Sequence, residues 1–189
     1  MNPLRADNLG GLIVSKGDYK DMTLGRKHFF AFCQTQDVAK WDATAAIGLI
    51  ISNPVGSGVN CVFNKWSVTV WATSINMTGM VLTVAPQPAI PTTTTAATLS
   101  GSTLLTGSVG LIQGAASAYS VATVGQPVIV WPLFHNTVAI NIVGAEVISG
   151  DLKSAIGIAP GTALCIGALG AAGVDVNLGI TWEEVPATL

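Results

Sequence analysis

The chain has 189 residues, enough for one domain with or without an additional arm. Its eight Lys and Arg are balanced by ten Asp and Glu, so it cannot build the basic stripe that neutralises several phosphates, and we expect no nucleic acid partner. Charged residues make up 10% of the chain, against about 25% in a typical soluble domain, but no apolar run approaches the ~20 residues of a membrane-spanning helix.

The N-terminal segment is rich in charge. Residues 1–42 hold eleven of the eighteen Lys, Arg, Asp and Glu residues. We therefore predict an extended N-terminal arm over residues 1–27, followed by a single domain over residues 28–189. The first residues lack the basic start and apolar core of a signal peptide, and the three cysteines have neither metal-ligand nor redox spacing. This pattern predicts synthesis in a reducing compartment.

Most of the chain after the arm has the hydrophobic pattern of β-strands. Only residues 35–46 indicate a helix, of one or two turns. Turns are expected at residues 78–79 and 160–161, where glycine or proline interrupts the pattern. Strands are expected at residues 46–52, 59–63, 66–75, 80–85, 118–124, 128–134, 138–148, 154–159, 162–169 and 174–185.

The C-terminal segment has the clearest strand pattern. Val174, Val176, Leu178, Ile180 and Trp182 alternate with polar or small residues, which is typical of a half-buried antiparallel strand. Over the whole chain, 21 Gly and 9 Pro punctuate short strands at the spacing of an all-β sandwich or barrel. We predict an all-β fold, specifically an antiparallel β-sandwich that is jelly-roll-like.

A long loop is expected between the two halves of the domain, at residues 85–103. Pro86, Pro88 and Pro91 precede four consecutive Thr, and proline lacks the N–H that a central strand donates. Loops of this length without secondary structure are usually functional or disordered. Both readings, an interaction loop and a plain surface loop, stay open.

Residues 66–145 contain no Lys, Arg, Asp or Glu. A monomer of 19.3 kDa exposes roughly 8,500 Å² by size scaling, so this chain would carry unusually few charges on its surface. Solubility normally requires charges of both signs and a net charge away from zero. We therefore expect other protein subunits to cover much of the surface.

The sequence predicts no catalytic residue, metal ligand or cofactor site, and we do not expect an enzyme. Neither His28 nor His135 has a second histidine, a cysteine or paired carboxylates at ligand spacing. Glu183 and Glu184 are adjacent on a predicted strand, so they face opposite sides and cannot act together on one substrate.

The stretch "IAPGTALCIGALGAAGVDVNLGITWEEVP", together with the polar arm and the neutral Thr-, Gly- and Ala-rich body, resembles small virion proteins of tailed bacteriophages. In particular it resembles the cement, or decoration, proteins of the capsid surface, and the resemblance covers residues 120–189 best. It implies a jelly-roll-like body, homo-oligomers that are commonly trimers, binding to the major capsid protein, and a virion location after synthesis in the host cytoplasm.

We expect the arm to dock on the shell and the neutral body to form the trimer. The basic residues expected to contact the shell are Arg5, Lys16, Lys20, Arg26 and Lys27. A phage fibre, spike or baseplate module that recognises a host-surface glycan is the alternative, which exposed Trp side chains would favour. A non-viral β-sandwich binding module, or an enzyme whose site the sequence does not show, is a third possibility.

Overall fold

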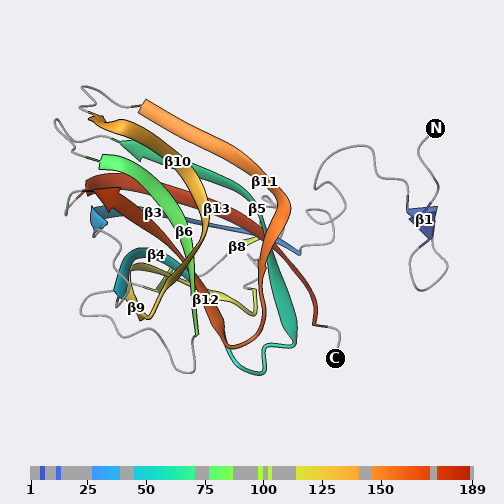
Figure 1. Cartoon of the computed structure of the whole chain (residues 1–189). Helices are drawn as coiled ribbons and strands as arrows, with labels where there is room; N and C mark the ends of the chain where they lie inside the picture. The colour runs from blue at the N-terminus through green and yellow to red at the C-terminus, as the bar shows by residue number, and fades with distance from the viewer. Residues whose placement is uncertain are drawn as a thin grey trace.

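The computed structural model describes residues 5–6, 12–13, 27–38, 45–70, 77–86, 98–99, 102–103, 114–140, 146–170 and 174–187. Within these ranges the regular secondary structure consists of β-strands alone, and all strand pairs are antiparallel (Figure 1). Two sheets pack face to face, which confirms the predicted antiparallel β-sandwich. The jelly-roll topology within that class stays a prediction. None of the described residues belongs to a helix with the length and hydropathy of a membrane span.

The larger sheet has six strands in the order β10-β6-β12-β4-β9-β7. Their bounds are β10 Val128–Ile140, β6 Met77–Pro86, β12 Thr162–Gly170, β4 Ala45–Asn53, β9 Ser117–Gly125 and β7 Thr98–Leu99.

The smaller sheet has five strands in the order β11-β5-β13-β3-β8. Their bounds are β11 Glu146–Ile158, β5 Val59–Val70, β13 Val174–Pro186, β3 His28–Val38 and β8 Ser102–Thr103. Two short strands, β1 Arg5–Ala6 and β2 Leu12–Ile13, pair separately. The division into an arm over residues 1–27 and a domain over residues 28–189 stays a prediction.

The core lies between the two sheets and follows the alternation of side chains along each strand. In β13 the predicted inner face is confirmed, because Val176, Leu178, Ile180 and Trp182 are all buried. They contact inner-face residues of the six-stranded sheet such as Leu164. Trp66 and Val68 of β5, two residues apart, are likewise buried and belong to the same core cluster.

The six-stranded sheet is also buried on part of its outer face. The residues next to the core residues of β12 and β4 point the other way, and they form a second cluster. Its members are Ile50, Ala85, Val124, Ala163 and Cys165, with Tyr119 packed against them. Strand β12, "TALCIGALG", is therefore buried on both faces from residue 163 to residue 168.

Several sequence predictions are wrong in detail. The one- or two-turn helix at residues 35–46 is not formed, because β3 continues to Val38 and β4 begins at Ala45; residues 39–44 lie outside the described ranges. Residues 138–148 are not one strand, since β10 ends at Ile140 and β11 begins at Glu146. The two strands predicted at residues 59–63 and 66–75 are one strand, β5, which the structure describes as far as residue 70.

The turn predicted at residues 78–79 is also wrong, because both residues lie inside β6. A Cβ atom at Gly79 would collide with the backbone carbonyl of Phe134 in β10, so the glycine permits close approach of two strands. The turn predicted at residues 160–161 is confirmed, and Gly161 has a positive φ of 83° there. Of the predicted loop at residues 85–103, the first two residues end β6, and most of the rest lies outside the described ranges.

Candidate functional site

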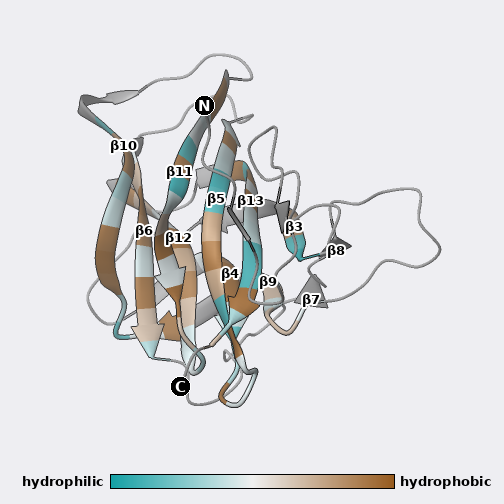
Figure 2. Cartoon of the chain, turned by 90° about the vertical axis from the view of Figure 1, so that its right-hand side faces the viewer, coloured by the Kyte–Doolittle hydropathy of each residue, from teal (hydrophilic) through white to brown (hydrophobic). Residues whose placement is uncertain are grey.

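Charge is distributed unequally between the two sheets. The strands of the six-stranded sheet contain no Lys, Arg, Asp or Glu. Residues 66–145, which contain no charged residue, supply β6, β7, β9 and β10 of this sheet. Strands β4 and β12 come from outside these residues and carry no charge either. Figure 2 shows the consequence as brown and white strands beside the teal segments of β5, β11 and β3. The charged residues in the five-stranded sheet are Asp37, Lys65, Glu146, Asp151, Lys153, Asp175, Glu183 and Glu184.

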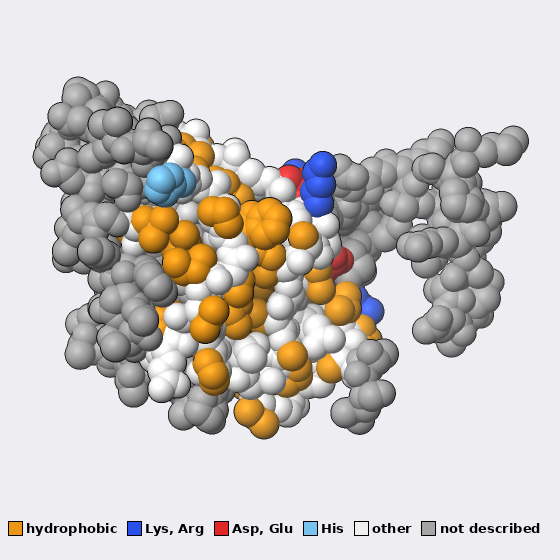
Figure 3. Space-filling view, viewed as in Figure 1, with side chains coloured by type: hydrophobic (Ala, Val, Ile, Leu, Met, Phe, Trp, Pro, Cys, Tyr) orange, Lys and Arg blue, Asp and Glu red, His pale blue; other side chains and the backbone are white. Residues whose placement is uncertain are grey.

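An apolar strip lies at the edge of the uncharged sheet, at the start of β10. Val128, Ile129, Val130 and Trp131 are exposed by 64%, 37%, 43% and 45% respectively. Since successive side chains of a strand point to opposite faces, four consecutive exposed residues mean that the strand is uncovered on both faces. We name residues 128–131 the β10 ledge. Figure 3 shows hydrophobic side chains gathered over β10 in the middle of this face, with Lys, Asp and Glu side chains at its right-hand rim.

The ledge does not present a regular pairing edge. The register of β10 against β6 shifts between Ile129 and Trp131, and Pro132 follows without a backbone N–H. Such irregularities block extension of a sheet by another strand. The ledge therefore offers side chains, rather than backbone hydrogen bonds, to a partner.

Strand β10 is anchored to the core at Phe134. Phe134 packs against the core and stacks with Trp66 of β5, and its backbone carbonyl lies against Gly79 of β6. Strand β10 is thus held by both sheets just beyond the ledge. An exposed apolar strip on a held strand is typical of a preformed interaction surface.

A polar cluster lies at the irregular part of β11. Asn64 of β5 is fully buried; its Nδ2 lies 3.3 Å from His28 Nε2, and its Oδ1 accepts a hydrogen bond from Ser154 Oγ at 2.8 Å. Ser154 has a positive φ of 59° and its Oγ lies 3.5 Å from Glu183 Oε1. Asn64 thus links His28 to Ser154. Because an amide does not take up a proton at neutral pH, His28 cannot activate the serine through this link.

The pKa values of the two titratable side chains in this cluster, His28 and Glu183, are both shifted in the direction that favours the uncharged form. Burial lowers the pKa of His28, and the nearby positive charge of Lys65 lowers it further. Burial raises the pKa of Glu183, while the contact with Ser154 opposes that rise. Both shifts favour the uncharged forms of His28 and Glu183, as expected of a partly buried structural network.

Glu184 holds the chain before β9 against β13. Its carboxylate accepts hydrogen bonds from the backbone N–H of Ala115 at 2.8 Å and of Ala116 at 3.0 Å, and from Trp182 Nε1 at 3.4 Å. Burial and the charge of Glu184 raise the pKa of the Cys61 thiol, which stays protonated at neutral pH. The prediction that Glu183 and Glu184 face opposite sides agrees with these separate surroundings.

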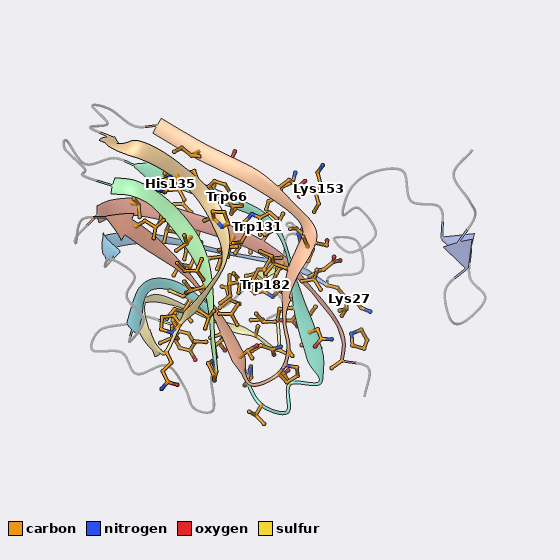
Figure 4. All side chains as sticks on the ribbon, in the orientation of Figure 1. Lys27, Trp66, Trp131, His135, Lys153 and Trp182 are labelled. Atoms are coloured by element: carbon orange, nitrogen blue, oxygen red, sulfur yellow. The ribbon has the colours of Figure 1, made fainter. Side chains whose placement is uncertain are left out.

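The structure places few of the predicted shell contacts. Arg5 lies in β1, where only the backbone is described, and Lys16, Lys20 and Arg26 lie outside the described residues. Lys27 is exposed and lines a small cavity of about 230 Å³ with Phe29, Glu184 and others. Figure 4 shows it on the same side of the molecule as Lys153 and opposite His135. Of the five predicted shell contacts, the described side chains therefore include Lys27 alone.

Among the described residues no group of three or more His, Cys, Asp and Glu side chains is arranged to hold a metal ion. The sequence predicts a strand at residues 128–134 but does not distinguish the β10 ledge within it. Its run of consecutive apolar residues is equally typical of a buried strand. Comparison with protein-family models, curated proteins and solved structures found no match to the chain.

Proposed function

We propose that this chain is a virion structural protein that binds the outer surface of a bacteriophage capsid as an oligomer, expected to be a trimer, and stabilises the shell. The observation that carries the proposal is the exposed β10 ledge on a sheet whose strands have no formal charge. Interfaces between protein subunits are depleted in charge at their centres and enriched in aromatic residues. Trp131, preceded in the ledge by Ile129 and Val130, has this composition.

Stabilisation of the shell would follow from mass action. A protein that binds the assembled shell but not its separated subunits shifts the equilibrium towards the assembled state, in proportion to its affinity. The neutral body would form the oligomer, and the basic residues of the arm, Arg5, Lys16, Lys20, Arg26 and Lys27, would contact the major capsid protein. Such an activity requires no catalytic residue and no cofactor.

One exposed tryptophan is the feature that would favour the alternative of a glycan-binding module, but an exposed ring alone does not make a sugar site. Of the three Trp residues with described side chains, Trp66 and Trp182 are buried and Trp131 is exposed. A sugar site needs hydrogen-bonding groups beside the aromatic ring. In the sheet Trp131 pairs with Leu82 of β6, which offers no side-chain donor or acceptor.

The test is binding to empty capsid shells. Wild-type protein should co-sediment with shells and raise their melting temperature. A version lacking residues 1–27 should form the same oligomer but bind shells more weakly. Absence of shell binding by the full chain would remove the cement proposal, and unchanged binding by the truncated chain would remove the role of the arm.

A further inference from the structure

The outer face of the five-stranded sheet contains a groove of about 350 Å³. Its floor follows one row of the sheet, in which Ser149, Ser67 and Gly179 lie side by side on β11, β5 and β13. The next residue in this row, Phe32 of β3, is 56% exposed and forms a wall of the groove together with Phe30. We name this hollow the β13 groove.

The groove exists because the central strand has no side chain at this point. Gly179 alternates with the core residues Leu178 and Ile180, so it faces outward. A Cβ atom at this position would come within 2.6 Å of Ser67 Oγ, so only glycine leaves the floor open. Lys65 and Thr181 also line the groove.

The groove and the ledge are complementary in kind. The ledge is an exposed apolar strip at the edge of one sheet, and the groove is a mostly apolar hollow in the outer face of the other. The five-stranded sheet itself stands between them, so the ledge of one chain cannot occupy its own groove. Two matching surfaces on opposite faces can be joined only between separate copies, and such contacts are head-to-tail.

The dimensions and chemistry of the two surfaces agree. A cavity of about 150 Å³ accommodates benzene, so about 350 Å³ accommodates the indole of Trp131 and an adjoining aliphatic group. Phe32 offers an aromatic face for offset stacking. The indole N–H needs an acceptor once buried, and the Ser67 and Ser149 hydroxyls line the groove.

We propose that the β10 ledge of one copy docks in the β13 groove of the next, with Trp131 as the anchor. This inference rests on the proposed oligomeric function and specifies how the oligomer is built. Each copy then contributes two different surfaces, and a trimer is the closed ring of three such contacts. The interface is heterologous, unlike a pairing of two β10 edges across a two-fold axis.

A mixing experiment tests the proposal. Trp131→Ala removes the ledge anchor and Phe32→Ala removes the groove wall, and each variant alone should dissociate at concentrations at least about 30-fold above wild type, the loss typical of a binding hot spot. An equimolar mixture should form pairs with one copy of each variant, because one intact ledge meets one intact groove. Native mass spectrometry with one variant isotopically labelled identifies these mixed pairs.

Two controls keep the test decisive. Val55→Ala and Val147→Ala remove exposed apolar side chains that belong to neither surface, so they should leave the mass unchanged. Ser149→Trp fills the groove from the exposed edge strand β11 without removing a core atom, so it gives a second groove variant if Phe32→Ala unfolds.

Each outcome decides between the alternatives. If both groove variants keep the wild-type oligomer while Trp131→Ala loses it, the ledge binds another surface and the head-to-tail inference is wrong, although the oligomeric function stands. Groove variants that keep the oligomer but lose binding to a panel of sugars would instead make the groove a glycan site. A wild-type monomer at every concentration would remove both the inference and the proposed function.

Discussion

Phe134 in the edge strand β10 stacks against Trp66 in β5, with ring centroids 6.4 Å apart and ring planes inclined by 20°. This contact joins the uncharged six-stranded sheet to the five-stranded sheet. It also lies just beyond the β10 ledge, so it holds the ledge in place.

Phe134→Ala should therefore weaken both folding and assembly. The substitution removes a half-buried aromatic ring from the core, and we expect the free energy of unfolding to fall by about 2–3 kcal/mol. Denaturation in urea measures this loss, and light scattering measures the oligomer. Val128→Ala, on the ledge but without a core contact, is the control for stability. An unchanged oligomer in a folded Phe134→Ala protein would show that the ledge does not need this anchor.

Glu184→Ala should destabilise the fold strongly. It leaves the backbone N–H of Ala116 and the indole N–H of Trp182 without their carboxylate acceptor, which costs about 2–4 kcal/mol. Glu184→Gln keeps one acceptor oxygen and should cost roughly half as much. Chemical denaturation of the two variants gives the comparison. Equal stability of Glu184→Ala and wild type would mean that water replaces the carboxylate without cost.

Glu183, unlike Glu184, should lower the stability of the folded protein at neutral pH. Its folded-state pKa is raised, so the folded protein binds more protons than the unfolded chain in the window just above the ordinary value of 4.5. Its contribution to stability is present below pH 4.5 and is lost as the pH rises through the folded pKa. Glu183→Gln should therefore be more stable than wild type at pH 7 and nearly equal to it at pH 4. Thermal unfolding at both pH values checks this; a variant less stable at pH 7 would contradict it.

His28 should make stability fall in mild acid. Its folded-state pKa is lowered, so below the ordinary value of 6.5 the unfolded chain binds more protons than the folded protein. Stability is fully present above pH 6.5 and is lost as the pH falls towards the folded pKa. His28→Gln keeps an acceptor for Asn64 Nδ2 but does not titrate. Its unfolding free energy, followed from pH 7.5 to pH 5, should decline less than that of wild type, and parallel curves would show that His28 is not the titrating group.

The fold class could be predicted because the strand pattern is local. The alternation in β13 and the turn before β12 at Gly161 depend only on residues that are close in the sequence, and both are confirmed. The split of residues 138–148 between β10 and β11 could not be read, because an apolar run alone does not show where the chain leaves a sheet. Gly79 was misread as a turn residue, because its partner Phe134 is distant in sequence.

For the candidate site, the sequence predicts that the surface lacks charge but not where that surface lies in the fold. The uncharged tract indicated buried surface, but the position of β10 at a sheet edge depends on pairing between distant strands, which a sequence pattern does not specify. The same holds for Glu184, whose acceptor role depends on Ala115 and Ala116, 69 and 68 residues away. The β13 groove likewise requires strands from four parts of the chain.

The measurement that tests the central claim most directly is the native mass of the isolated protein by light scattering after gel filtration, at several concentrations. If other subunits cover the uncharged sheet and the ledge, the mass should lie near three times 19.3 kDa, and Trp131→Ala should lower it. A soluble monomer of 19.3 kDa that persists at high concentration would show that water tolerates the uncharged surface, and the account of this protein as an assembling subunit would fail.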